Sequence, residues 1–106
     1  MNGNRDSLSG LITELISILT IVKEKITDDS DLIWTSYETH IELREEIDRC
    51  IYQLQQNHER ILDEIKIHFA PTSVFQEQAM SNGWTEEYRA LAERFDDVYE
   101  LLNRYR

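Results

Sequence analysis

Two groups of carboxylates are the residues of this sequence best placed to do chemistry. The first group is Glu42, Glu45 and Glu46, and the second is Glu93, Asp96 and Asp97. Residues three and four positions apart share one face of a helix, so each group would present its oxygens together. Carboxylate oxygens are ligands for Mg²⁺, which supports phosphate chemistry. If the two groups faced each other, they could hold a catalytic metal ion.

This pairing of two acidic helical motifs resembles the all-α nucleoside triphosphate pyrophosphohydrolases. The resemblance implies an alternative function, Mg²⁺-dependent hydrolysis of a nucleoside triphosphate, with the ligands Glu42, Glu45, Glu93, Asp96 and Asp97. The sequence departs from the family pattern because the gap between the groups is long and no cluster of Lys or Arg is available to hold a triphosphate. Acidic residues at these spacings are common on solvated helix faces. The preferred interpretation therefore has neither a metal nor another cofactor.

Three histidines and one cysteine offer no clear metal-binding pattern. His58 and His68 would lie about 15 Å apart along a continuous helix, too far to share one ion. Glu64 and His68 have the i,i+4 spacing of a chelating pair, but we interpret the histidines as polar residues that set the register between helices. Cys50 has no partner for an intrachain disulfide. It is expected to pack as a small apolar residue.

A net charge of −10 restricts the class of partner. Binding to nucleic acid requires clustered Lys and Arg, and an anionic membrane surface also attracts basic segments, so neither is expected. The charge is compatible with a basic protein partner. The apolar run over residues 11–22 is too short and too polar to span a membrane, and no secretory signal precedes it. With the lone cysteine, these features favour the cytoplasm.

The composition favours a few long helices, because the chain has only one proline and three glycines to make turns. Apolar residues recur at steps of three and four, as they do in helices. Asn82 and Gly83 form a strong helix stop signal. The sequence therefore predicts a single all-α domain, of helical-bundle type, with helices over residues 7–26, 31–69, 73–81 and 85–105.

Residues 31–69 contain neither proline nor glycine, and they are predicted to form one long central helix. The short polar break before this helix should fold the first helix back antiparallel to it. Each flanking helix could cover only half of the central helix, which leaves apolar surface exposed. We therefore expect a homodimer that completes the bundle. Its predicted seam consists of Ile33, Tyr37, Ile47, Ile51, Leu54, His58, Ile61 and Ile65.

Large apolar side chains gather around the only proline, in the corner between the central and last helices. Such residues can close the end of a core, or they can anchor a partner protein. The expected function is a small acidic interaction module that acts as an adaptor, regulator or inhibitor of a basic partner. A purely structural dimer is a further alternative. The candidate partner-binding residues are Phe75, Met80, Trp84, Glu42, Glu45 and Glu46.

Overall fold

The computed structural model describes residues 7–26, 40–58, 60–70 and 74–105. Within these ranges the secondary structure is entirely helical apart from short turns, and there is no strand. The prediction of an all-α protein is therefore confirmed. The helices are α1 (Leu8–Lys25), α2 (His40–Gln55), α3 (Ile61–Phe69), α4 (Val74–Asn82) and α5 (Thr85–Asn103).

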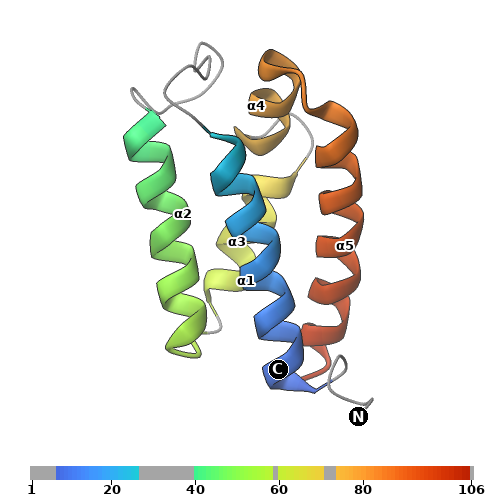
Figure 1. Ribbon diagram of the computed structural model, residues 1–106. Coiled ribbons are helices and arrows are strands. Elements are labelled where there is room, and N and C mark those ends of the chain that lie inside the picture. The colour runs from blue at the N-terminus through green and yellow to red at the C-terminus, as the bar shows by residue number, and fades with distance from the viewer. Residues whose placement is uncertain (1–6, 27–39, 59, 71–73, 106) are drawn as a thin grey trace.

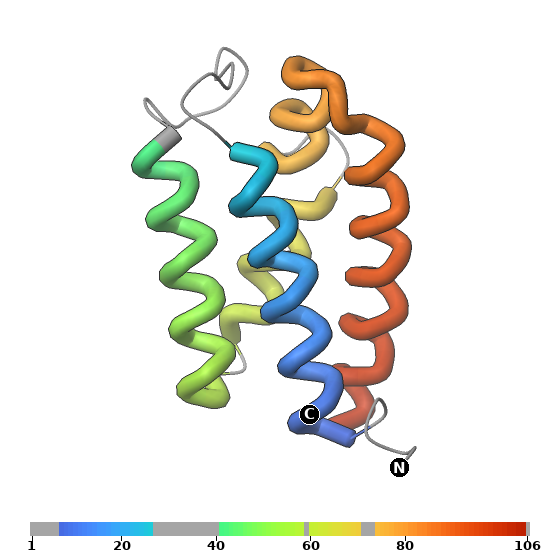
Figure 2. The backbone as a smooth tube through the Cα atoms, in the orientation of Figure 1, coloured from blue at the N-terminus to red at the C-terminus, as the bar shows by residue number. Residues whose placement is uncertain are grey.

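Four of these helices run alternately up and down, and the short helix α4 lies at one end, between α3 and α5 (Figures 1 and 2). Helix α1 lies between α2 and α5, and α3 runs behind it. This position accounts for the broad apolar stripe on α1, because one helix must cover two neighbours. The buried residues of the stripe are Leu11, Leu15, Ile18, Leu19 and Val22.

The prediction of one long helix over residues 31–69 is wrong. Residues 31–39 lie outside the described ranges. The rest of the predicted helix is divided into two helices, because α2 ends at Gln55 and α3 begins at Ile61. The break is a Schellman motif: the amide of His58 donates to the carbonyl of Gln53 at 3.1 Å, and the amide of Asn57 donates to that of Leu54, also at 3.1 Å. Asn57 adopts the left-handed conformation that this motif requires, with φ 60°.

This turn lets α3 run antiparallel to α2, so the predicted seam residues point into the core of the same protomer. Ile47, Leu54, Ile61 and Ile65 are all buried there, whereas His58 is exposed at the turn. Ile51 is half-buried, and Ile33 and Tyr37 lie outside the described residues. Four of the predicted seam residues are therefore covered within one copy of the chain.

The aromatic corner forms the end of the core. Phe69 makes an edge contact with Phe75 at a centroid distance of 5.0 Å and stacks on Phe95 at 4.5 Å. Tyr88 donates from its hydroxyl to the backbone carbonyl of Phe69 at 3.1 Å, which ties α5 to the end of α3. Phe75 and Trp84 are both buried. Their burial supports the interpretation that these two side chains close the end of the core, and not the interpretation that they anchor a partner protein.

The predicted stop at the end of α4 is confirmed. The helix ends at Asn82, and Gly83 follows with φ 81°. The amide of Trp84 donates to the carbonyl of Ala79 at 3.0 Å, which closes the turn. Glycine takes this conformation without the steric cost that a Cβ would impose.

Candidate functional site

The densest group of potential ligand atoms in the described residues joins α2 to α3. The group consists of Glu46, Cys50 and His68, and one ligand atom from each lies within 4.8 Å of the others. Glu46 and Cys50 are four residues apart on α2 and so share one helix face. The antiparallel course of α3 brings His68 opposite that face.

Glu46 is the centre of this cluster. Its Oε2 atom lies 3.0 Å from His68 Nε2 and 3.7 Å from the Sγ atom of Cys50, which donates to it. The side chains of Glu46 and His68 are 18% and 14% exposed, so water can reach one side of the cluster. Cys50 closes the other side, with only 1% of its surface exposed.

Arg49 holds the Glu46 carboxylate in place. Its Nε and Nη2 atoms donate to the two oxygens of Glu46 at 2.9 Å each, in the forked geometry that suits a carboxylate. The same Nη2 atom also donates to Glu64 Oε1 at 2.7 Å. Burial by itself would raise the pKa of Glu46, but the hydrogen bonds from Arg49 and His68 outweigh it and lower the pKa. Glu46 is therefore an anion near neutral pH.

Burial raises the pKa of the Cys50 thiol to about 12, and the nearby negative charge of Glu46 adds to the increase. A thiol with this pKa is protonated near neutral pH and is a poor nucleophile. The prediction that Cys50 packs in the core is confirmed by its burial. A metal ion would nevertheless find a sulfur ligand here, because coordination displaces the thiol proton.

Sequence reasoning did not find this cluster. It recognised the Glu64–His68 pair, but in the structure Glu64 holds Arg49 while His68 meets Glu46. The i,i+4 spacing of Glu46 and Cys50 could have indicated that these two side chains lie together on one helix face. The contribution of His68 was hidden, because a continuous helix would have carried it far from Glu46.

The two acidic groups predicted to share Mg²⁺ are not brought together. One lies on α2 and the other on α5, and these helices stand on opposite sides of α1 (Figure 1). Among the described residues, the only set of three or more possible ligand atoms within 4.8 Å of one another is the Glu46 cluster. The ligands of the alternative Mg²⁺ site considered from the sequence were Glu42, Glu45, Glu93, Asp96 and Asp97.

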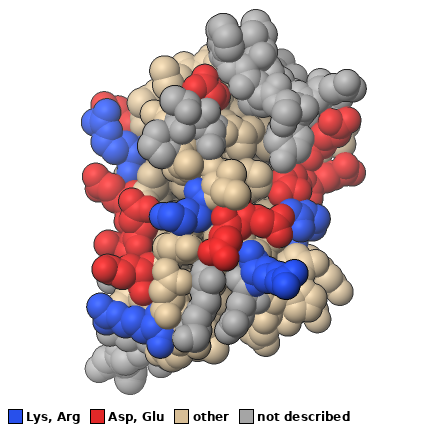
Figure 3. All heavy atoms as spheres, turned by 180° about the vertical axis from the view of Figure 1, so that it is seen from behind, with Lys and Arg blue, Asp and Glu red and all other residues tan. Residues whose placement is uncertain are grey.

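The predicted partner-binding residues separate into surface and core. Glu42, Glu45 and Met80 are exposed and Glu46 is partly buried, whereas the two aromatic candidates named above are in the core. On the face shown in Figure 3, acidic side chains lie along both edges and near the middle, and basic side chains lie among them. The described residues on this face therefore form no continuous basic patch of the kind that nucleic acid requires.

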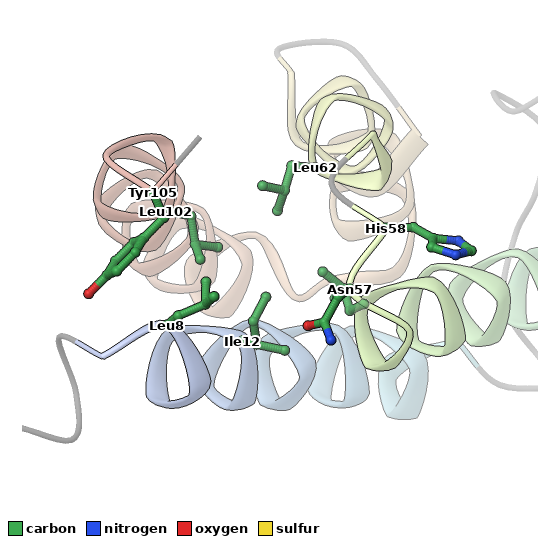
Figure 4. Close-up of a pocket in the computed structure, with 8 residues that line it drawn as sticks. Leu8, Ile12, Asn57, His58, Leu62, Leu102 and Tyr105 are labelled. Carbon is green, nitrogen blue, oxygen red and sulfur yellow. The ribbon is translucent and has the colours of Figure 1, made fainter.

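A small apolar cavity lies at the end of the bundle where α1 begins and α5 ends (Figure 4). Its volume is about 90 Å³, and Leu8, Ile12, Leu62 and Leu102 point into it from three helices. His58 also lines the cavity but points away from its centre. A cavity with this lining could hold a small apolar group, but it offers few polar groups to orient a reaction.

Comparisons with models of protein families, with curated proteins and with solved structures find no match to this chain. No helix within the described ranges is both long and apolar enough to cross a membrane.

Proposed function

We propose that the protein is a small acidic helical interaction module whose contact surface is the outer face of α2. The observation that carries this proposal is a line of exposed side chains along that helix. Ile41 and Tyr52 are 53% and 57% exposed, although large apolar residues are normally buried. The residues of the outer face are Ile41, Glu45, Asp48 and Tyr52.

Helix geometry places these residues on one stripe. Positions i, i+4, i+7 and i+11 fall within about 60° of one another at 3.6 residues per turn. The stripe therefore has an apolar side chain at each end and carboxylates between them. Asp48 forms an ion pair with Lys23 of α1 at 2.8 Å, so one carboxylate is partly neutralised, and exposed Glu42 flanks the stripe.

A basic amphipathic segment of another protein fits this pattern. Its apolar residues would cover Ile41 and Tyr52, and its Lys or Arg side chains would face the carboxylates between them. The net charge of −10 would accelerate the encounter with a basic partner, and salt would slow it. The proposed setting is the cytoplasm, since a single buried thiol suits a reducing compartment.

The test is affinity capture from the native host with the tagged full chain and two variants. Replacing both Ile41 and Tyr52 by Ser should abolish capture of the partner and leave the melting temperature nearly unchanged, because both side chains are exposed. The matched control is Ile67→Ser, which removes a 63% exposed side chain from α3 and should leave capture intact. Capture that survives the double substitution, or that does not weaken as salt rises, contradicts the proposal.

A homodimer is the second candidate, supported by a different pair of exposed apolar side chains. Ile67 on α3 and Met80 on α4 are 63% and 59% exposed. A second copy is better accommodated there than on the acidic outer face of α2, where like charges would meet. Light scattering at micromolar concentration should give twice the chain mass, and replacing Ile67 and Met80 by Ser should reduce it to the mass of one chain. A wild-type protein that stays a monomer excludes this candidate.

A further inference from the structure

We propose that Glu46, Cys50 and His68 form a Zn²⁺-binding site that links α2 to α3. This site lies away from the outer face of α2, and the inference does not depend on the proposed interaction function. Three observations support it, namely the spacing of the ligand atoms, their chemical type and the charges around them.

The spacing of the ligand atoms is close to that of a tetrahedral zinc centre. Bonds of about 2.0–2.1 Å to nitrogen and oxygen and about 2.3 Å to sulfur place N and O about 3.3 Å apart, and S about 3.6 Å from either. Glu46 Oε2 lies 3.0 Å from His68 Nε2 and 3.7 Å from Cys50 Sγ. The Sγ atom of Cys50 and the ring nitrogen of His68 lie within 4.8 Å of each other, so a movement of these side chains by up to about 1 Å would complete the tetrahedral spacing.

The three donors favour zinc over the hard cations. Mg²⁺ and Ca²⁺ select sets of oxygen atoms, whereas a sulfur and an imidazole nitrogen favour Zn²⁺ and its spectroscopic substitute Co²⁺. Three protein ligands leave the fourth position for water. The solvent-accessible side of Glu46 and His68 provides a route for both the ion and this water.

The surrounding charges balance when zinc is bound. The Glu46 carboxylate and a Cys50 thiolate together neutralise the two positive charges of the ion. Arg49 would otherwise repel a cation, but it also contacts Glu64 at 2.7 Å, which compensates its charge. The hydrogen bonds from Arg49 would meanwhile hold Glu46 in the orientation that coordination needs, as partners of metal ligands commonly do.

Zinc binding requires the Cys50 thiol to release its proton to the solvent. The thiolate that remains would form the sulfur–metal bond, and its negative charge would offset one of the two positive charges of the ion.

A bound ion would fasten the α2–α3 hairpin. Two of its ligands lie before the turn at Asn57 and the third lies after it, so coordination would resist separation of the two helices. The ring of His68 also lies 5.3 Å from that of Phe75 on α4, which extends this connection to the aromatic end of the core. Zinc should consequently raise the melting temperature of the folded protein.

The experiment is a titration of the full, chelator-treated chain with Zn²⁺ in competition with a chromophoric chelator. We expect one equivalent to bind. Co²⁺ in place of Zn²⁺ should give a thiolate-to-metal charge-transfer band and the intense visible bands of a tetrahedral centre. Mg²⁺ should neither compete with Zn²⁺ nor raise the melting temperature.

Substitutions at the site separate this proposal from adventitious binding. His68→Gln and Cys50→Ser should each weaken zinc binding by more than the roughly 10–100-fold expected for loss of an outer-shell partner. Cys50→Ser should also remove the charge-transfer band. The matched control is His58→Gln, which removes an exposed histidine outside the site and should retain wild-type affinity.

Circular dichroism of each metal-free variant checks that it is folded. If the buried substitution Cys50→Ser prevents folding, His68→Gln decides the question, because His68 is partly exposed. Equal zinc affinity in wild type and His68→Gln, a cobalt complex without the thiolate band, or binding lost equally in His58→Gln would overturn the proposal.

Discussion

The Glu46 carboxylate is contacted by three side chains. Two nitrogens of Arg49, the ring of His68 and the thiol of Cys50 all approach it. Their combined effect lowers the pKa of Glu46 despite its partial burial. The carboxylate therefore stabilises the folded state in its ionised form, and this contribution depends on pH.

Replacing Glu46 by Gln should destabilise the protein near neutral pH by about 1.5 kcal/mol, because Arg49 loses a charged acceptor. The pKa is near 4.5 in the unfolded chain and lower in the folded protein, so the stabilisation is complete above about pH 4.5 and is lost as the pH falls through the folded value. The difference between variant and wild type should shrink in acid. Urea unfolding across this pH range measures it.

The control for this prediction is Glu45→Gln on the same helix. Glu45 is exposed, so the substitution should change stability by no more than about 0.5 kcal/mol at any pH. A Glu46→Gln variant whose destabilisation stayed constant down to acid pH would contradict the role given to the ionised carboxylate.

Phe95→Ala should lower the free energy of unfolding by about 3–5 kcal/mol, which is a large share of the stability of a domain this size. Phe95 is fully buried and stacks on Phe69, so the substitution leaves a cavity where α5 meets α3. Guanidinium unfolding monitored by circular dichroism measures the loss. Tyr52→Ala removes an exposed ring and should change stability by less than about 0.5 kcal/mol. A loss of similar size in both variants would refute this account of the core.

At the scale of elements, the α2–α3 turn determines the architecture. The left-handed conformation of Asn57 ends α2, and the amides of Asn57 and His58 bond back to carbonyls in its last turn. Asparagine reaches this conformation more readily than other residues that carry a Cβ. The turn thus converts one periodic stretch of sequence into two antiparallel helices.

Substitutions of Asn57 test the turn directly. Asn57→Val should lower the free energy of unfolding by about 1–2 kcal/mol, because a branched Cβ opposes the positive φ at this position. Asn57→Gly should leave the free energy of unfolding nearly unchanged, because glycine adopts positive φ freely. Gln55→Val controls for the loss of a polar side chain near the same helix end. Thermal unfolding by calorimetry distinguishes the three variants. If the Val and Gly variants at position 57 were equally stable, residue 57 would not adopt the left-handed conformation in solution.

At the scale of the whole molecule, one core connects all five described helices. Contacts at the surface reinforce it: Arg94 of α5 pairs with Glu14 of α1 at 3.7 Å, and the hydroxyl of Tyr99 donates to Asp63 of α3 at 3.0 Å. Each helix contributes buried side chains to the same cluster. Examples from α1 through α5 are Leu15, Ile47, Ile65, Phe75 and Phe95.

A shared core of this kind predicts a single cooperative unfolding transition. Circular dichroism, which reports on helices, and tryptophan fluorescence, which reports on buried Trp84 among others, should give the same midpoint. Hydrogen exchange provides a control because the most protected amides of α1 and α5 should open with the same free energy. A separate early transition in either probe would show that part of the bundle folds independently.

The sequence by itself determined the class of structure and several helix limits. Apolar residues at steps of three and four indicated helices, and the structure places the first and last of these at Leu8–Lys25 and Thr85–Asn103. Gly83 marked the end of α4 because glycine alone takes positive φ without cost. These features depend on nearby residues, so a local pattern is sufficient to predict them.

Tertiary structure decided the course of the chain between residues 40 and 69. The apolar period continues almost unbroken through the turn at Asn57, so periodicity alone could not separate two antiparallel helices from one long helix. In the folded protein, Ile47 and Ile65 are buried in the same core, and this burial favours the turn that brings α3 back along α2. The same fold-back brings His68 to Glu46, which is 22 residues away. A contact between distant residues depends on the path of the backbone, and no local spacing encodes that path.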